Sequence, residues 1–302
     1  MKIKVPVIKS GTRNLELRTA YLWLLPALSL LFLFAFLPLL NTFWMSLHHR
    51  VPIFGLNQFV GLDNYSHIFH NPRFWHSLGV TAYFTLVSVV CELILGFLVA
   101  HLLWKDFKGY AWVMGILLIP WILPTTVTAK MWEWIFAAPQ GLLNFFLVQS
   151  GVLKSSRAWL SSPFWAMQMA ILADVWKTTP FMALLLLVGL RTIPENLYRA
   201  ARVDGANSFQ MFWHVTLSEL RPILLVAVLF RGLDAFRVFD VVYVLTGGGP
   251  ANSTESLSIY TYKIFFQTLQ FGVGAALGVL MFLSTGLLSL IVLWFMRERR
   301  LV

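Results

Sequence analysis

Long apolar runs constrain this chain more than any other feature of its sequence. Each run is close to or longer than the roughly 20 residues that an α-helix needs to cross the hydrocarbon core of a bilayer. Backbone groups in lipid must find partners within their own segment, so such runs fold as helices. Six runs are predicted to span the membrane, at residues 21–47, 75–103, 110–136, 164–190, 222–245 and 271–296. We therefore expect an all-α, polytopic membrane protein.

The composition agrees with a membrane protein and excludes an ordinary soluble domain. Of the 302 residues, 58% are apolar and 12% are charged, whereas soluble domains carry about 25% charged residues. The formal net charge of +10 would suggest nucleic-acid binding in a soluble chain. Here the basic residues flank apolar runs and no nucleic-acid motif is present, so we expect membrane lipid around the chain and no nucleic-acid partner.

The basic residues between the apolar runs predict how the chain is oriented. Fourteen Lys and Arg residues fall on one side, in the tail 1–20, the connections 104–109 and 191–221, and the C-terminus, against five on the other side. The positive-inside rule assigns the richer side to the cytoplasm. We predict a cytoplasmic N-terminal tail at 1–20 and a transmembrane domain at 21–302 whose C-terminus is cytoplasmic. The first run is too long for a signal-peptide core, so we expect it to be retained.

The cytoplasmic segment 191–221 is amphipathic and too polar to cross a membrane. Pro194-Glu195 stands where a helix can begin, and Asp204-Gly205 is a stop or turn signal. A second amphipathic run follows from Phe209. The pattern therefore predicts a helix, a turn and a second helix. The alternative is a helix that lies on the membrane surface.

The same segment resembles a known family motif. The motif consists of the run Tyr198-Arg-Ala-Ala-Arg-Val-Asp-Gly-Ala206 followed by Phe212, Leu217 and Pro222. It is similar to the EAA loop in the permease subunits of binding-protein-dependent ABC importers, in the carbohydrate-uptake branch of the maltose and glycerol-3-phosphate inner-membrane subunits. Two outer segments, Gly61–Tyr65 and Phe239–Pro250, also resemble that branch. The resemblance covers residues 20–300.

This resemblance implies the type I ABC importer permease fold, with six transmembrane helices and a cytoplasmic coupling helix in the loop 191–221. In that family the coupling helix docks in a cleft of an ATPase. The positions that match the coupling motif are Arg199, Ala200, Ala201, Asp204, Gly205 and Ala206. The chain departs from the motif twice, because Arg199 replaces the usual Glu and Ser218 the usual Pro. The reversed charge at Arg199 implies an altered ATPase contact, for which a compensating acidic residue on the ATPase is one solution.

Charged residues inside the predicted spans form a second group of interest, because they are costly in lipid and face the bundle interior or water. Two pairs of opposite charge lie three residues apart on one helix face, Lys130 with Glu133 and Asp174 with Lys177. In the fifth span the signs alternate at the same spacing through Arg231, Asp234, Arg237 and Asp240. Glu92 has no such neighbour, so we expect its partner on another helix.

These charges have two interpretations, a polar pathway lined by spans three, four and five, or structural ion pairs between helices. Lys130 and Glu133, near the outer end of their span, favour the structural interpretation. The resemblance implies that the fourth and fifth spans contact a sugar. The candidate pathway residues are Asp174, Lys177, Thr178, Phe181, Arg231 and Asp234. Arg231 stands where the family has a neutral polar group, which leaves an acidic or phosphorylated sugar open as substrate.

No enzyme activity is expected of this chain. It has no Gly-x-x-x-x-Gly-Lys-Ser/Thr phosphate loop, and we predict no catalytic residue, no metal site and no cofactor. ATP and Mg are expected on a partner ATPase. The partners that the resemblance implies are a second permease subunit, a cytoplasmic ATPase dimer and an extracytoplasmic solute-binding protein.

The predicted function is import of a sugar or polyol, or of a sugar phosphate, by alternating access across a bacterial or archaeal cytoplasmic (inner) membrane. An ion-gradient-driven secondary transporter is the first alternative, and the intramembrane charges would suit it. That alternative leaves the loop motif unexplained. A membrane-embedded enzyme is the second alternative, but no His, Asp and Glu constellation lies at a membrane boundary.

Overall fold

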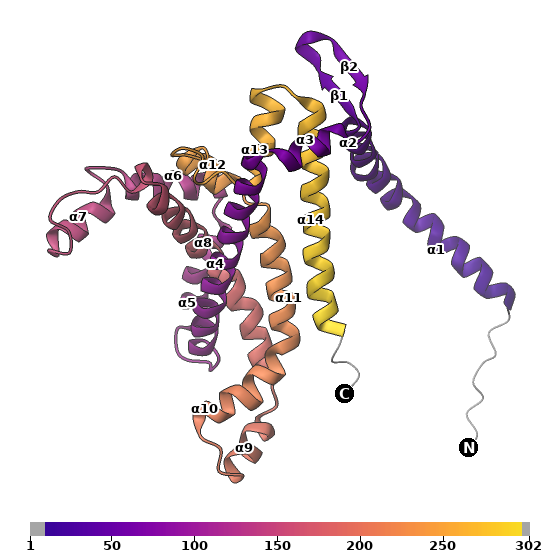
Figure 1. The fold of residues 1–302 in the computed structure, drawn as a ribbon. Coiled ribbons are helices and arrows are strands. Elements are labelled where there is room, and N and C mark those ends of the chain that lie inside the picture. The colour runs from indigo at the N-terminus through magenta and orange to yellow at the C-terminus, as the bar shows by residue number, and fades with distance from the viewer. Residues whose placement is uncertain (1–9, 298–302) are drawn as a thin grey trace.

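The computed structural model describes residues 10–297, with side chains described for 21–295. The first nine residues of the predicted cytoplasmic tail and the C-terminal residues 298–302 lie outside this range. Figure 1 shows long helices side by side, with a strand hairpin and the short helices α3 and α13 at one end and α9 and α10 at the opposite end. Among the described residues, five helices are long and apolar enough to cross a bilayer, and one bent pair supplies a sixth if it counts as a single span.

The first span and the hairpin that follows it stand at the edge of the molecule. Helix α1 (Ser10–Leu31) continues through a π-helical turn into α2 (Leu37–Ser46), and α1 diverges from the other helices in Figure 1. Strands β1 (His48–Val51) and β2 (Leu56–Phe59) pair antiparallel with His48 opposite Phe59. The hairpin rests on the start of α14 at Gly272, where a Cβ would collide with the His48 carbonyl oxygen.

Three long helices form the centre of the molecule, α4 (Pro72–Leu102), α8 (Pro163–Thr192) and α11 (Leu217–Phe236), and α14 (Phe271–Arg297) packs beside α11. Pro72 and Pro163 occupy the first helical turn, where the missing N–H has no helical partner in any case. Helices α4 and α8 pack closely at Gly96, whose Cβ, if present, would lie 2.7 Å from Met182 Cγ. The glycine therefore permits the contact between these two spans.

The predicted span 110–136 is not one straight helix. It consists of α5 (Tyr110–Ile122) and α6 (Thr125–Phe136), which meet at an angle of 92°. Leu123 is extended, with φ −63° and ψ 139°, because a residue before proline is disfavoured in the helical region, and Pro124 itself has no N–H to donate. The break leaves the last carbonyl groups of α5 without helical partners.

The helix that contains the predicted fifth span, 222–245, has different bounds from that span. The helix begins at Ser208 with α10 (Ser208–Met211), passes through a π-helical turn and continues as α11 to Phe236. It starts early because Asn207 and Gln210 form a reciprocal capping box, which is a stronger start signal than Pro222. It ends early because the chain leaves helical geometry at Phe239 and the Val238 carbonyl accepts a hydrogen bond from Ser256.

Short elements complete the two ends of the bundle. They are α3 (Asp63–His70), α7 (Leu142–Gln149), α9 (Glu195–Val203), α12 (Asp240–Thr246) and α13 (Leu257–Tyr262). The predicted all-α, multi-span architecture is confirmed, with the small hairpin as its one sheet in the described part of the chain.

Candidate coupling and translocation sites

The segment predicted to couple to a partner forms a helix, a turn and a second helix. Helix α9 begins after Pro194 and ends at Val203, with Asp204 as its C-cap. Gly205 has φ +79°, a left-handed conformation that residues with a Cβ rarely adopt, and the turn closes with a hydrogen bond of 2.9 Å from Ala206 N to Ala201 O. Helix α9 projects at the end opposite the strand hairpin (Figure 1).

One side chain fixes α9 to the membrane-spanning helices. Tyr198 is buried, and its hydroxyl lies 3.0 Å from Thr216 Oγ1 in the π-helical turn that leads into α11. The Tyr198 ring also packs against Trp104, at the end of the second span, with centroids 5.6 Å apart. These two contacts join α9 to the start of α11 and to the segment that follows α4.

The six predicted coupling residues fall into two groups. A groove of about 270 Å³ between α9 and α10 is lined by Ala201, Asp204, Gly205 and Ala206, with Gln210, Met211, His214 and Val215 on its other side. Arg199 and Ala200 lie outside the groove on the exposed surface of α9. The Arg199 guanidinium donates to Glu195 Oε2 at 2.8 Å, one helical turn earlier.

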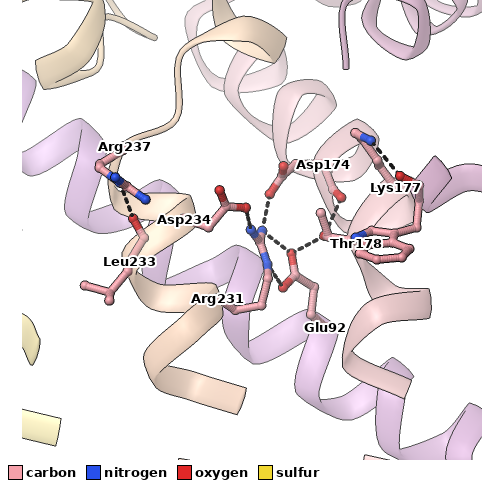
Figure 2. Close-up of polar contacts among 9 residues, drawn as sticks. Glu92, Asp174, Lys177, Thr178, Arg231, Leu233, Asp234 and Arg237 are labelled. Carbon is pink, nitrogen blue, oxygen red and sulfur yellow. Dashed lines mark hydrogen bonds and ion pairs between the residues drawn. The ribbon is translucent and has the colours of Figure 1, made fainter. Parts of the chain in front are cut away.

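The charges at the centre of the bundle form one connected network (Figure 2). Arg231 of α11 donates from Nε and Nη2 to the two carboxylate oxygens of Glu92 on α4, at 2.5 and 2.6 Å. Its Nη2 also donates to Asp174 on α8 at 2.7 Å, and its Nη1 donates to Asp234 at 2.5 Å. Thr178 donates to the Glu92 carboxylate at 2.6 Å. A single guanidinium thus connects α4, α8 and α11.

The members of this network differ in how far they reach the surface. The side chains of Arg231 and Glu92 are 3% and 0% exposed, whereas that of Asp234 is 69% exposed. Three carboxylates surround one guanidinium and accept from four of its five N–H groups, and the open side of the network presents the Asp234 carboxylate. The expected i,i+3 pair of Arg231 with Asp234 is present, and the expected partner of Glu92 is indeed on another helix.

Two other predicted pathway residues, Lys177 and Phe181, contact the end of α5. Lys177 does not pair with Asp174, because Arg231 binds that carboxylate. Its ammonium donates instead to the carbonyl oxygens of Trp121 and Leu123, at 3.2 and 2.7 Å. These carbonyls lack helical partners where α5 breaks, and a cation suits a helix C-terminus. Phe181 stacks on Trp121 with centroids 5.6 Å apart.

Of the remaining predicted ion pairs, Lys130–Glu133 is present and the pairing expected of Arg237 is not found among the described residues. Lys130 and Glu133 pair at 2.6 Å on an exposed surface, as expected. The alternation does not continue past Asp234 in the described part of the chain, since Arg237 donates to the Leu233 carbonyl and has no ion pair with a carboxylate. The helix ends at Phe236, so the spacing of three no longer brings Arg237 and Asp240 to one face.

Three residues that contact the predicted sites were not themselves predicted as site residues from the sequence: Glu92, Trp121 and Glu195. The sequence did indicate that Glu92 is important, because an isolated carboxylate inside an apolar run requires a buried partner. Nothing in the sequence indicated a role for Trp121, because its contacts with Lys177 and Phe181 depend on the bend after α5. Glu195 was identified only as a helix start, although its spacing of four from Arg199 permits an ion pair.

Comparisons with known proteins agree on one family. The family model described as "Binding-protein-dependent transport system inner membrane component" matches residues 92–300. The trehalose/maltose transport system permease protein MalF of Thermococcus litoralis is 42% identical over 97% of this chain and 98% of its own. The sulfoquinovosyl glycerol transport system permease protein SmoG of Agrobacterium fabrum is 38% identical over 87% of this chain and 85% of its own.

A solved structure gives the same fold. The chain matches a bacterial ABC transporter involved in the import of the acidic polysaccharide alginate with a TM-score of 0.81 and 20% identity, over 96% of this chain and 99% of that one. The alternative of an ion-gradient-driven secondary transporter is therefore wrong. The chain belongs to the binding-protein-dependent transport system inner membrane components and is a multi-pass permease subunit of an ABC importer.

Proposed function

We propose that this chain carries an uncharged sugar or polyol into the cytoplasm by alternating access, driven by ATP hydrolysis on a separate subunit. The observation that carries the proposal is the attachment of α9, a short exposed helix held to α11 through Tyr198 and Thr216. Its fixed geometry supports a role in passing a partner's movement to the spans. The names of the two relatives, which refer to trehalose/maltose and sulfoquinovosyl glycerol transport, support a sugar-like substrate. Trehalose and maltose are uncharged, whereas a sulfoquinovosyl group carries an anionic sulfonate, so the proposed uncharged character rests on the charges of this chain and not on the two names.

The proposed partners are a second permease subunit, a cytoplasmic ATPase dimer that binds ATP and Mg, and an extracytoplasmic solute-binding protein. The family description names binding-protein-dependent transport, which supports the last of these. We place both termini in the cytoplasm, on the side of α9. The excess of Lys and Arg on that side supports this orientation, as does the position of the end of α14 at the same end as α9 in Figure 1.

In the proposed mechanism, the ATPase moves α9 and the central network transmits the movement. Because Arg231 holds Glu92, Asp174 and Asp234 together, α4, α8 and α11 shift as one unit. Lys177 keeps the broken end of α5 attached to α8. A unit of this kind can tilt against a second permease and open to one side of the membrane at a time.

The charge arrangement supports an uncharged substrate. Arg231 is the cation that the sequence left open for an acidic or phosphorylated sugar, and its guanidinium is already held by three carboxylates. The exposed Asp234 carboxylate can accept hydrogen bonds from sugar hydroxyl groups. A phosphate placed beside it would meet a like charge.

Purification of the tagged chain in mild detergent from its own host, followed by mass spectrometry, tests the proposed assembly. We expect a phosphate-loop ATPase and a second six-span protein to accompany the chain. The purified assembly, mixed with its binding protein, should hydrolyse ATP faster when trehalose or maltose is added. A chain that purifies alone and transports either sugar in liposomes without ATP would contradict the proposal.

A further inference from the structure

We infer that the coupling helix α9 carries its own counter-ion for Arg199, and that the ATPase groove facing it needs no acidic residue there. This inference rests on the proposed function, in which α9 docks on an ATPase. The Arg199 guanidinium lies 2.8 Å from Glu195 Oε2 on the same helix. The two side chains are 70% and 73% exposed, so both face outward and belong to the surface that a partner would cover.

The geometry of the helix favours this pair before any partner arrives. Glu195 precedes Arg199 by four residues, the more favourable order for an ion pair on a helix. Glu195 also lies in the first turn of α9, where a negative charge suits the helix N-terminus. No other carboxylate pairs with Arg199 within the described residues.

Docking on the ATPase increases the energetic contribution of the Glu195–Arg199 ion pair. In water an exposed ion pair contributes little, because solvent screens both charges. In a protein groove both charges lose their water, and an isolated charge there is strongly unfavourable. A pair that enters together largely neutralises itself, whereas removal of one partner leaves an uncompensated charge. The pair therefore lets α9 dock without a matching charge on the ATPase.

The rest of the outward surface indicates the kind of groove that fits it. Val203, at the end of α9, is 87% exposed, and Ala200 is also exposed. Val203 lies one helical turn beyond Arg199 on the same face, so an apolar side chain adjoins the pair. Arg202 and Asp204 are exposed elsewhere on this segment. A groove that is mainly apolar opposite Arg199, without a carboxylate, matches this surface.

A double-mutant cycle tests the inference. The permease pair is placed in nanodiscs, and the Kd of the purified ATPase for it is measured without substrate. Glu195→Gln and Arg199→Gln should each weaken binding about tenfold, since each leaves one charge unpaired. The double variant E195Q/R199Q and the exchanged pair E195R/R199E should bind within about threefold of the wild type. Lys105→Gln, an exposed cation outside α9, controls for the loss of one positive charge and should bind like the wild type.

Other outcomes have distinct meanings. An acidic residue on the ATPase would make Arg199→Gln harmful and Glu195→Gln harmless, and neither double variant would recover binding. That pattern would overturn the inference and leave the proposed function intact. Failure of the wild-type permease pair to bind the ATPase would overturn the proposed function, and the inference with it.

Discussion

At the scale of residues, the charges of this protein differ in importance according to their burial. Arg231 is enclosed by Glu92, Asp174 and Asp234 at the junction of three helices. Lys130 and Glu133 form a similar pair on the surface of α6. A buried charge cannot return to water when its partner is lost, so the two sites should respond very differently to mutation.

Arg231→Met should reduce the free energy of unfolding by about 3–5 kcal/mol, because it leaves buried carboxylates without a cation. Lys130→Met removes a cation whose side chain is 64% exposed, and should change the same quantity by less than about 1 kcal/mol. Thermal and denaturant unfolding of the two variants in the same detergent measures the contrast. Equal losses of stability would contradict the structural role given to Arg231.

A second residue-scale prediction concerns Glu255, which joins the start of α4 to α13. Burial by itself raises the pKa of this carboxyl, but hydrogen bonds from Arg73 and Lys263 outweigh burial and hold the pKa below its ordinary value. Its stabilising contribution is therefore present above the ordinary pKa of about 4.3 and lost as the pH falls through the lowered value. In wild type, the free energy of unfolding should fall as the pH drops from about 4.3 to the lowered pKa of Glu255, and Glu255→Gln should flatten this fall. An unchanged pH profile in the variant would contradict the stabilising role of the Glu255 ion pairs with Arg73 and Lys263.

At the scale of elements, short-range chemistry decides where helices begin, bend and end. The bend at Pro124 and the capping box at Asn207 were both visible as residues in the sequence. Their consequences were missed because a run of apolar residues outweighs local signals in a search for spans. The helix–turn–helix at 191–221 was predictable, since Pro194-Glu195, Asp204-Gly205 and the amphipathic pattern all agree.

Gly205→Val should change the orientation of α9 relative to α10 in the cytoplasmic loop. A β-branched residue at φ +79° is strained by about 1–3 kcal/mol, so the turn between α9 and α10 must change shape. We expect normal membrane insertion with at least about tenfold weaker ATPase binding, which corresponds to about 1.4 kcal/mol. Gly205→Asn is the matched control, because asparagine tolerates left-handed geometry and should retain binding. Wild-type affinity in the valine variant would show that the turn is not needed.

At the scale of the whole molecule, the all-α, multi-span architecture was predictable and the central network was only partly so. Apolar length and basic flanks are properties of the sequence, and they produced the six-span prediction. The spacing of three identified Arg231 with Asp234, but the contact of Arg231 with Glu92 and Asp174 depends on how three helices pack. The contact of Lys177 with the end of α5 was not predictable, because it exists only after the bend.

The central claim is that ATP hydrolysis on a partner drives uptake of an uncharged sugar through this chain. Proteoliposomes that contain the full assembly, with ATP inside and the binding protein outside, allow uptake of radiolabelled trehalose and maltose to be measured directly. We expect uptake of at least one of these sugars, and this uptake should require both ATP and the binding protein and be lost in Gly205→Val. Uptake that continues without ATP and follows an imposed ion gradient would contradict this claim.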